Sequence, residues 1–129
     1  MEFGELLKQF LIDLQCLFRT QLKHLNLTLP QIMLISSIPI DGIDMTSLSK
    51  KLGIDNSTLT RLIRILLENG IVKKTSNPID KRSIIVSLSR KGESLQLKIE
   101  KEMDLFISAL YKNIPMENRE ELNESLSAF

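Results

Sequence analysis

Hydrophobic residues near the N-terminus recur with the spacing of an α-helix. Between residues 3 and 24 they return every three or four positions, which places them on one face of an amphipathic helix. They are Phe3, Leu6, Leu7, Phe10, Leu11, Leu14, Leu17 and Phe18. The pattern predicts a first helix over this range, with its apolar face turned away from water.

A second helix is expected to begin just after Thr28. Thr28 and Gln31 have the spacing of a capping box, in which each side chain accepts a hydrogen bond from the other residue's backbone amide. Leu27 and Ile32 flank them at the spacing of a hydrophobic staple. We expect this helix to end near Ser37, because a proline follows two residues later.

Two further helices with a tight turn between them are predicted in the middle of the chain. Thr46 is placed to cap a short helix from Ser47 to Leu52, which Gly53 ends. Asp55 is placed to cap the next helix, over residues 56–69. Two short helices joined by a turn of three or four residues that contains glycine form a helix-turn-helix.

A β-hairpin is predicted directly after these helices. Residues 71–74 and the β-branched stretch 83–88 are expected to form its strands, and Asn77-Pro78 is a turn signal. The tip is expected to be eight to ten residues long and is rich in Lys, Asp and Arg. Ser89 then caps a long helix, about Arg90 to Asn113, and a shorter helix begins at Met116.

The order of these elements predicts the fold class. Four helices, a hairpin and two helices indicate a mainly α fold with a small β-hairpin wing, a winged helix-turn-helix. At 129 residues we expect a single domain. In it, residues 39–89 form the winged lobe, and residues 1–38 and 90–129 form flanking helices.

Charge is distributed unevenly along the chain, although the net charge is only +1. Residues 46–92 contain ten basic and three acidic residues, a net charge of +7, and the remainder has a net charge of −6. The basic residues are Lys50, Lys51, Arg61, Arg64, Lys73, Lys74, Lys81, Arg82, Arg90 and Lys91. A polyanion would be attracted to the middle of the chain and repelled by its ends. By itself such clustering also fits an ordinary solvated surface.

The helix over residues 56–69 has two chemically different faces. Its apolar face consists of Leu59, Leu62, Ile63, Leu66 and Leu67. The opposite face and its flanks present Ser57, Thr58, Thr60, Arg61 and Arg64. A helix anchored on one side, with guanidinium and hydroxyl groups on the other, suits the major groove of DNA, where Arg binds guanine and Ser or Thr binds a base edge or a phosphate. The positive end of the helix dipole would also favour a phosphate.

The basic hairpin tip strengthens this interpretation. A hairpin that follows a helix-turn-helix can cross the phosphate backbone and insert an arginine into the minor groove. We expect Lys73 and Lys81 to contact phosphates and Arg82 to enter the groove. Asp80 is either a hydrogen-bond or ion-pair partner that holds the tip in shape or a simple turn former.

Composition excludes several other classes of protein. No apolar stretch is long enough for a transmembrane helix, and the acidic start does not resemble a secretory signal. A single cysteine, Cys16, fits a reducing cytosol, so we expect a cytoplasmic protein in which Cys16 is buried and inert. His24 is the single histidine, so no metal site is expected. No catalytic constellation or glycine-rich phosphate loop is present, so we expect neither an enzyme nor a cofactor.

The central motifs resemble the MarR family of bacterial regulators. The matching segments are Leu48–Ile54, Ser57–Ile63, Leu66–Val72, Asp80–Arg82, Val86–Ser89 and Gly92. The family's wing pattern is Asp-x-Arg, a short strand and Leu-Thr-x-x-Gly. This chain has Ser89 where threonine is usual and Asn56 where proline is frequent. Neither departure threatens the fold.

The resemblance implies a homodimer in which the first and the last two helices pack across a two-fold axis. Each recognition helix would enter a major groove of a pseudo-palindromic double-stranded operator, with Ser57, Thr58, Thr60, Arg61 and Arg64 in the groove and Arg82 in the wing. We expect a repressor that a small-molecule effector releases from DNA. Met103, Phe106 and Tyr111 are candidates for an effector pocket or for the dimer core. The alternative is a winged helix that binds another protein without DNA.

Overall fold

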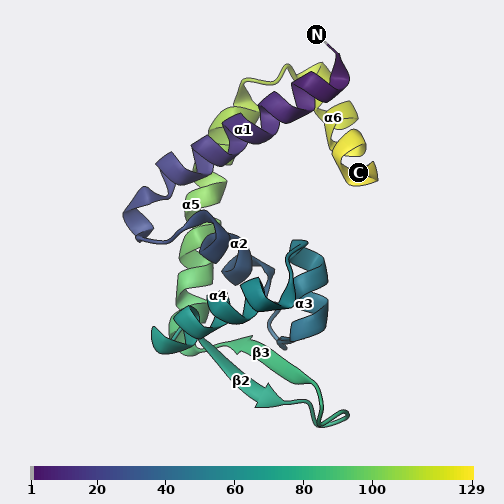
Figure 1. Cartoon of the computed structure of the whole chain (residues 1–129). Helices are drawn as coiled ribbons and strands as arrows, with labels where there is room; N and C mark the ends of the chain where they lie inside the picture. Colours follow the sequence, from purple (N-terminus) through teal and green to yellow (C-terminus); the bar gives the residue numbers. More distant parts are fainter. Residues whose placement is uncertain (1) are drawn as a thin grey trace.

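The computed structural model describes residues 2–129 and is mainly helical, with one small sheet (Figure 1). Its elements in chain order are α1 (Phe3–Gln21), η1 (Lys23–Leu25), α2 (Leu29–Ser37), β1 (Ile43–Asp44), α3 (Met45–Leu52), α4 (Asn56–Glu68), β2 (Val72–Ser76), β3 (Ile84–Leu88), α5 (Arg90–Lys112) and α6 (Met116–Ala128). This confirms the predicted winged helix-turn-helix fold. The hairpin lies at one end of the molecule, and the start of α1 and α6 lie at the other (Figure 1). Within residues 2–129, no helix is long and apolar enough to cross a membrane.

The first helix is shorter than the sequence pattern predicts. It ends at Gln21, and residues 23–25 form a separate 3₁₀ turn rather than its last turn. Asn26 then takes a left-handed conformation, with φ of 56°, which redirects the chain. The predicted capping box is confirmed, because the Thr28 hydroxyl accepts from the Gln31 amide and the Gln31 side chain accepts from the Thr28 amide.

The sheet has three strands rather than the two of the predicted hairpin. The strand order is β1-β3-β2, and both pairs are antiparallel. β1 is only two residues long, with Ile43 opposite Val86. The loop between β2 and β3 covers residues 77–83, so the hairpin tip is shorter than the predicted eight to ten residues because β2 continues to Ser76.

The cap of α3 differs from the prediction. Asp44, not Thr46, is the N-cap residue, since its carboxylate accepts hydrogen bonds from the Ser47 amide at 2.8 Å and the Ser47 hydroxyl at 2.7 Å. These hydrogen bonds lower the pKa of Asp44 below its ordinary value, the side-chain bond to Ser47 most of all. The pairing of β1 with β3 keeps Asp44 extended up to the first residue of α3, and the helix therefore begins at Met45.

The core lies where α2, α4 and the sheet meet the N-terminal half of α5. Its fully buried side chains include Leu34, Ile35, Leu59, Ile63 and Ile99. Gln96 of α5 spans this junction, because its Nε2 donates to the carbonyl oxygens of Ile35 at 2.8 Å and Ile38 at 2.9 Å. The Ile35 carbonyl also accepts from the amide of Ile38, the C-cap residue of α2, at 3.4 Å, so Gln96 adds a second bond there and joins the end of α2 to the long helix α5.

Candidate nucleic-acid interface

Helix α4 is fixed to the core along one side. Leu59, Ile63 and Leu66 are completely buried. Burial of a side chain of this size contributes about 1.5–3 kcal/mol, so the helix cannot rotate about its axis without a large loss of stability. The opposite face is exposed at Ser57, Thr60, Arg61 and Arg64, whereas Thr58 is half-buried. The predicted polar face therefore projects into solvent from a rigid base.

Asp55 organises the N-terminal end of α4. Its Oδ1 accepts hydrogen bonds from the Thr58 amide at 2.7 Å and from the Ser57 hydroxyl at 3.0 Å. The bond from the Thr58 amide is the main reason that the pKa of Asp55 lies below its ordinary value, and the positive charge of Arg61 lowers it slightly further. A carboxylate thus already occupies the positive end of the helix. A phosphate would be repelled there, which is contrary to the expectation from the helix dipole alone.

The hydroxyl groups of Ser57 and Thr60 are both committed as donors. Ser57 donates to Asp55, and the Thr60 Oγ1 donates to the Asn56 carbonyl oxygen at 2.7 Å. Since a hydroxyl has a single hydrogen, each presents only lone pairs to a ligand. Lone pairs suit the amino groups of adenine and cytosine, which donate in the major groove, and do not suit phosphates, which only accept. Arg61 and Arg64 provide the donors that guanine and phosphates require.

The turn before α4 sets the angle between the two short helices. Gly53 ends α3 with a φ of 66°, a left-handed conformation that costs glycine little. Its amide donates to the Lys50 carbonyl at 3.2 Å, and the Ile54 amide donates to the Ser49 carbonyl at 3.1 Å. These two bonds complete the C-cap of α3, and α4 begins at Asn56, three residues after Gly53.

The wing is held at its base and extends beyond the core at its tip. Val72 and Leu88 pair across the two strands and are buried, whereas Lys73 and Lys74 are exposed. The loop closes with hydrogen bonds from the Asn77 amide to the Ser83 carbonyl and from the Ser83 amide to the Asp80 carbonyl, both at 3.0 Å. The tip is therefore a defined turn and not a loose loop.

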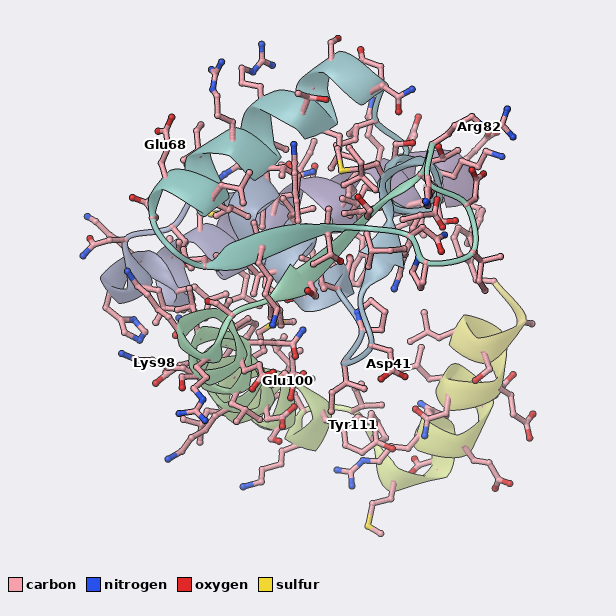
Figure 2. All side chains as sticks on the ribbon, turned by 90° about the horizontal axis from the view of Figure 1, so that it is seen from below. Asp41, Glu68, Arg82, Lys98, Glu100 and Tyr111 are labelled. Carbon is pink, nitrogen blue, oxygen red and sulfur yellow. The ribbon has the colours of Figure 1, made fainter. Side chains whose placement is uncertain are left out.

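Asp80 and Arg82 are linked within this turn. The Asp80 Oδ1 accepts from the backbone amide of Arg82 at 3.0 Å and from its Nε at 3.4 Å. The side chain of Arg82 is nevertheless 94% exposed and points outward from the tip (Figure 2). An exposed ion pair contributes little stability, so the effect of this one is to restrict the directions that Arg82 samples. The geometry fits both interpretations of Asp80, the turn former and the support of Arg82.

Asn77 has a role at the tip beyond the turn signal that Asn77-Pro78 provides. Its Oδ1 accepts a hydrogen bond from the Ile79 amide at 3.0 Å. Asn before Pro-x is a known pattern for such a side-chain turn, so the sequence did contain the signal.

The ten basic residues between positions 46 and 92 are all exposed, but they do not all have the same role. The Nζ of Lys51 donates to the Ser37 carbonyl and the Nζ of Lys91 to the Asn69 carbonyl, each at 2.9 Å. These two lysines neutralise the C-terminal ends of α2 and α4. The arginines of α4 and the basic residues of the wing make no such contact with a helix end in the part of the chain described. They form the positive surface.

Two expectations concern residues outside this surface. Cys16 is exposed, so the prediction of a buried cysteine is wrong for the single chain. His24 lies 3.5 Å from Glu102, a contact between η1 and α5 that the sequence did not indicate. Among residues 2–129 no group of three or more potential ligands is close enough to hold a metal ion.

An exposed basic recognition helix, its helix-turn-helix partner and a hairpin on a three-stranded sheet define a winged helix-turn-helix protein. Comparison with known proteins gives a more specific result. The model of the MarR family matches residues 27–84, which run from the cap of α2 to the start of β3.

The chain is similar to curated transcriptional regulators. It is 30% identical over 87 residues to the uncharacterised HTH-type transcriptional regulator YdgJ of Bacillus subtilis, an alignment that covers 67% of this chain and 53% of that protein. It is 34% identical over 80 residues to the multiple antibiotic resistance protein MarR of Salmonella typhimurium, covering 61% and 56%. The matches therefore span about half the length of these relatives.

Solved structures match almost the whole chain. Wild-type MarR from E. coli superimposes with a TM-score of 0.85 at 25% identity, over 99% of this chain and 96% of that one. A mutant of the same protein in complex with operator DNA gives a TM-score of 0.82 at 26% identity, over 97% and 91%. The chain belongs to the MarR family of transcriptional regulators.

Proposed function

We propose that this protein is a transcriptional regulator that binds double-stranded DNA in a sequence-specific manner. The observation on which the proposal rests is the exposed face of α4, which presents Arg61 and Arg64 together with two acceptor hydroxyls from a helix fixed in the core. The resemblance to MarR from E. coli, which has been solved with operator DNA, supports the proposal.

Each predicted contact residue has a separate task in this proposal. Helix α4 enters the major groove, where the arginines donate to guanine or phosphate and the hydroxyl groups accept from base amino groups. The wing crosses the backbone. Lys73 and Lys81 neutralise phosphates, and Arg82 enters the minor groove, where the negative potential is strongest in narrow A·T-rich sequence. The groove residues are Ser57, Thr58, Thr60, Arg61 and Arg64. Asp80 holds Arg82 in direction.

We further propose that the protein acts as a homodimer. The flanking helices α1, α5 and α6 expose many large apolar side chains, more than a monomer usually leaves in water. They are Phe3, Leu6, Leu7, Phe10, Leu11, Ile12, Leu97, Leu105, Ile107, Leu110, Met116, Leu122 and Leu126. Residues 1–38 and 90–129 would then be mainly dimerisation helices and residues 39–89 the DNA-binding lobe. A two-fold dimer binds a pseudo-palindrome with half-sites about one helical turn apart.

A cavity between the lobes suits a small effector. It has a volume of about 280 Å³ and is formed by α1, α2 and the helix-turn-helix. Its lining is apolar at Met33, Ile54 and Leu62, with Arg19 and Gln15 as polar groups at one side. None of Met103, Phe106 and Tyr111 lines it, although Met103 and Phe106 pack on the core. An effector there would shift α1 against α4, change the spacing of the two recognition helices and release the DNA, as expected of a repressor.

DNA binding also implies where the protein acts and what it needs in order to bind. A regulator of this kind acts in the cytoplasm, where bacterial DNA is located, and binds without a cofactor. It performs no catalysis.

Selection from a random DNA pool, followed by salt titration of the selected duplex, tests the proposal. Neutralisation of phosphates releases counterions, so the logarithm of the binding constant should fall steeply with the logarithm of salt concentration. Arg61→Ala should cost roughly 1–3 kcal/mol at the selected site. Lys98→Ala removes the same charge from α5, where the side chain points away from α4 (Figure 2), and should leave affinity unchanged. A salt slope near zero contradicts DNA binding and favours a protein-interaction module.

A further inference from the structure

An isoleucine lies in the loop at the wing tip, where its neighbours other than Pro78 are polar or charged. Ile79 is 96% exposed, and it follows the exposed Pro78 and precedes Asp80. Isoleucine is among the residue types most often found buried. Since Ile79 touches almost nothing in the chain, it does not stabilise the fold.

The backbone around Ile79 is fixed on both sides. Its own amide donates to the Asn77 Oδ1 at 3.0 Å. Two bonds described above, from the Arg82 amide to Asp80 and from the Ser83 amide to the Asp80 carbonyl, fix the residues that follow. Pro78 restricts the preceding φ angle as well. The turn therefore holds the Ile79 side chain out in solvent, and little conformational entropy is left to lose when it contacts a ligand.

The location of Ile79 points to one ligand. In the proposed function, Arg82 enters the minor groove, and Ile79 is three residues before it on the same closed turn. The walls of the minor groove are deoxyribose rings, and proteins that enter it often place an apolar side chain such as Ile against the sugars or between base pairs. We propose that Ile79 makes an apolar contact with the minor groove beside Arg82. This inference rests on the proposed function.

Two other occupants fit the tip less well. A second protein, or a second copy of this chain, needs about 800 Å² on each partner for a stable interface. The apolar part of the tip consists of two residues, Pro78 and Ile79, and the residues that follow are charged. These two residues are too few to form a protein interface but are enough for one contact in a groove of DNA.

A salt titration distinguishes this contact from a charged one. The probe is a duplex selected by the wild-type protein from a random pool, and the variants are Ile79→Ser and Arg82→Ala. Ile79→Ser should weaken binding about fivefold to tenfold at every salt concentration, because a groove contact covers only part of a side chain of this size, and the slope should be unchanged. Arg82→Ala should reduce the slope by about one, because a positive charge in the minor groove also displaces counterions from the DNA. Ile79→Leu should bind like the wild type.

Ile40 provides a matched control. It is also an exposed isoleucine, at 88%, but it precedes β1, at the end of the sheet away from the wing tip. Ile40→Ser should bind like the wild type, and the melting temperatures of both serine variants should be unchanged. A second duplex, with 2,6-diaminopurine in place of adenine under the wing, adds an amino group to the minor groove only. On that duplex the difference between wild type and Ile79→Ser should disappear.

The outcomes separate the inference from the function beneath it. If the wild-type protein selects no duplex or shows no salt dependence, the proposed function fails, and the inference fails with it. If the wild type binds with a steep slope and Ile79→Ser binds equally well, the function stands and the inference is wrong. A loss on Ile79→Ser that persists on the diaminopurine duplex also overturns it, because the contact would then lie outside the minor groove.

Discussion

The carbonyl oxygen of Ile71 lies directly against Gly92. It accepts a hydrogen bond from the Ser89 amide at 3.0 Å, which holds it in place, and the Ser89 hydroxyl lies between it, at 2.9 Å, and the Gly70 carbonyl oxygen, at 2.6 Å. A Cβ atom on residue 92 would overlap this oxygen and press on the Leu88 side chain. Glycine at this position therefore allows the start of α5 to pack against the base of the wing.

Replacement of this glycine should destabilise the protein. Gly92→Ala is expected to lower the free energy of unfolding by about 1–3 kcal/mol, as for other small-to-large changes at a packed contact. Urea denaturation measures the loss. Gly4→Ala is the control, since an added Cβ at Gly4 meets nothing within 4 Å, and its stability should be unchanged or slightly higher. Equal midpoints for Gly92→Ala and the wild type would show that the wing base adjusts freely.

The cap of α4 should make stability depend on acid pH. The pKa of Asp55 is lower in the folded chain than its ordinary value of 3.8, mainly because of the hydrogen bond from the Thr58 amide. Its stabilising contribution is therefore complete above that value and is lost as the pH falls through the lower folded pKa. The melting temperature should decrease below about pH 4. Asp55→Asn keeps an acceptor at the cap but does not titrate there, so its decrease over this range should be smaller.

A parallel pH profile of the two proteins would contradict this assignment. Asp44, whose pKa is lowered in the same direction by Ser47, leaves part of the pH dependence in the Asp55→Asn variant. The double variant with Asp44→Asn should be flatter still.

Strong local signals made the recognition helix and the wing predictable from the sequence. Helix α4 has a cap residue, Asp55, an apolar face with helical spacing and a glycine just beyond its end. Each signal arises within the segment itself, and the helix was predicted to within one residue. Ser89 was likewise identified correctly as the cap of α5, because its hydroxyl accepts from the Gly92 amide.

The features that the sequence did not show depend on distant partners. β1 is two residues long and has no periodicity, and it exists only because Ile43 and Asp44 pair with β3. Thr46 and Asp44 could each act as the N-cap of α3, and the pairing of β1 with β3 selects Asp44. The contact of Gln96 with the end of α2 joins residues about sixty positions apart, which no local pattern can indicate. In the candidate site, Asn77 is a local signal for the closed turn around Ile79. No local signal indicates that the Ile79 side chain is exposed.

Two substitutions at Asp80 distinguish the effect of its charge from the effect of its hydrogen bonds to Arg82. If Asp80 acted only as a charge, it would repel phosphate, and both Asp80→Ala and Asp80→Asn would strengthen DNA binding. Its carboxylate, however, accepts two hydrogen bonds from Arg82. We expect Asp80→Ala to weaken binding severalfold, because the direction of Arg82 is no longer restricted. Asp80→Asn keeps the acceptor for the Arg82 amide and should bind as well as the wild type or better.

Affinity for the selected duplex, measured at one salt concentration, gives the answer. Stronger binding by Asp80→Ala would show that the turn does not need the carboxylate and that the repulsion dominates. The double variant with Arg82→Ala provides the control, since Asp80→Ala should then have little further effect.

The exposed apolar faces of α1 and α5 should decide both assembly and DNA affinity. Phe10 of α1 is 58% exposed and Leu105 of α5 is 62% exposed. Helix α1 lies away from the wing (Figure 1). If these faces join two copies, Leu105→Glu places a charge in the interface and should produce a monomer in analytical ultracentrifugation, with the secondary structure retained. A monomer contacts one half-site, so its affinity for a full operator should fall by at least tenfold and its salt slope by about half.

Ile40→Glu adds the same charge to an exposed isoleucine outside these helices and should remain dimeric. Wild-type protein that sediments as a monomer at micromolar concentration would contradict the proposed dimer, and the apolar faces of α1 and α5 would then need another partner.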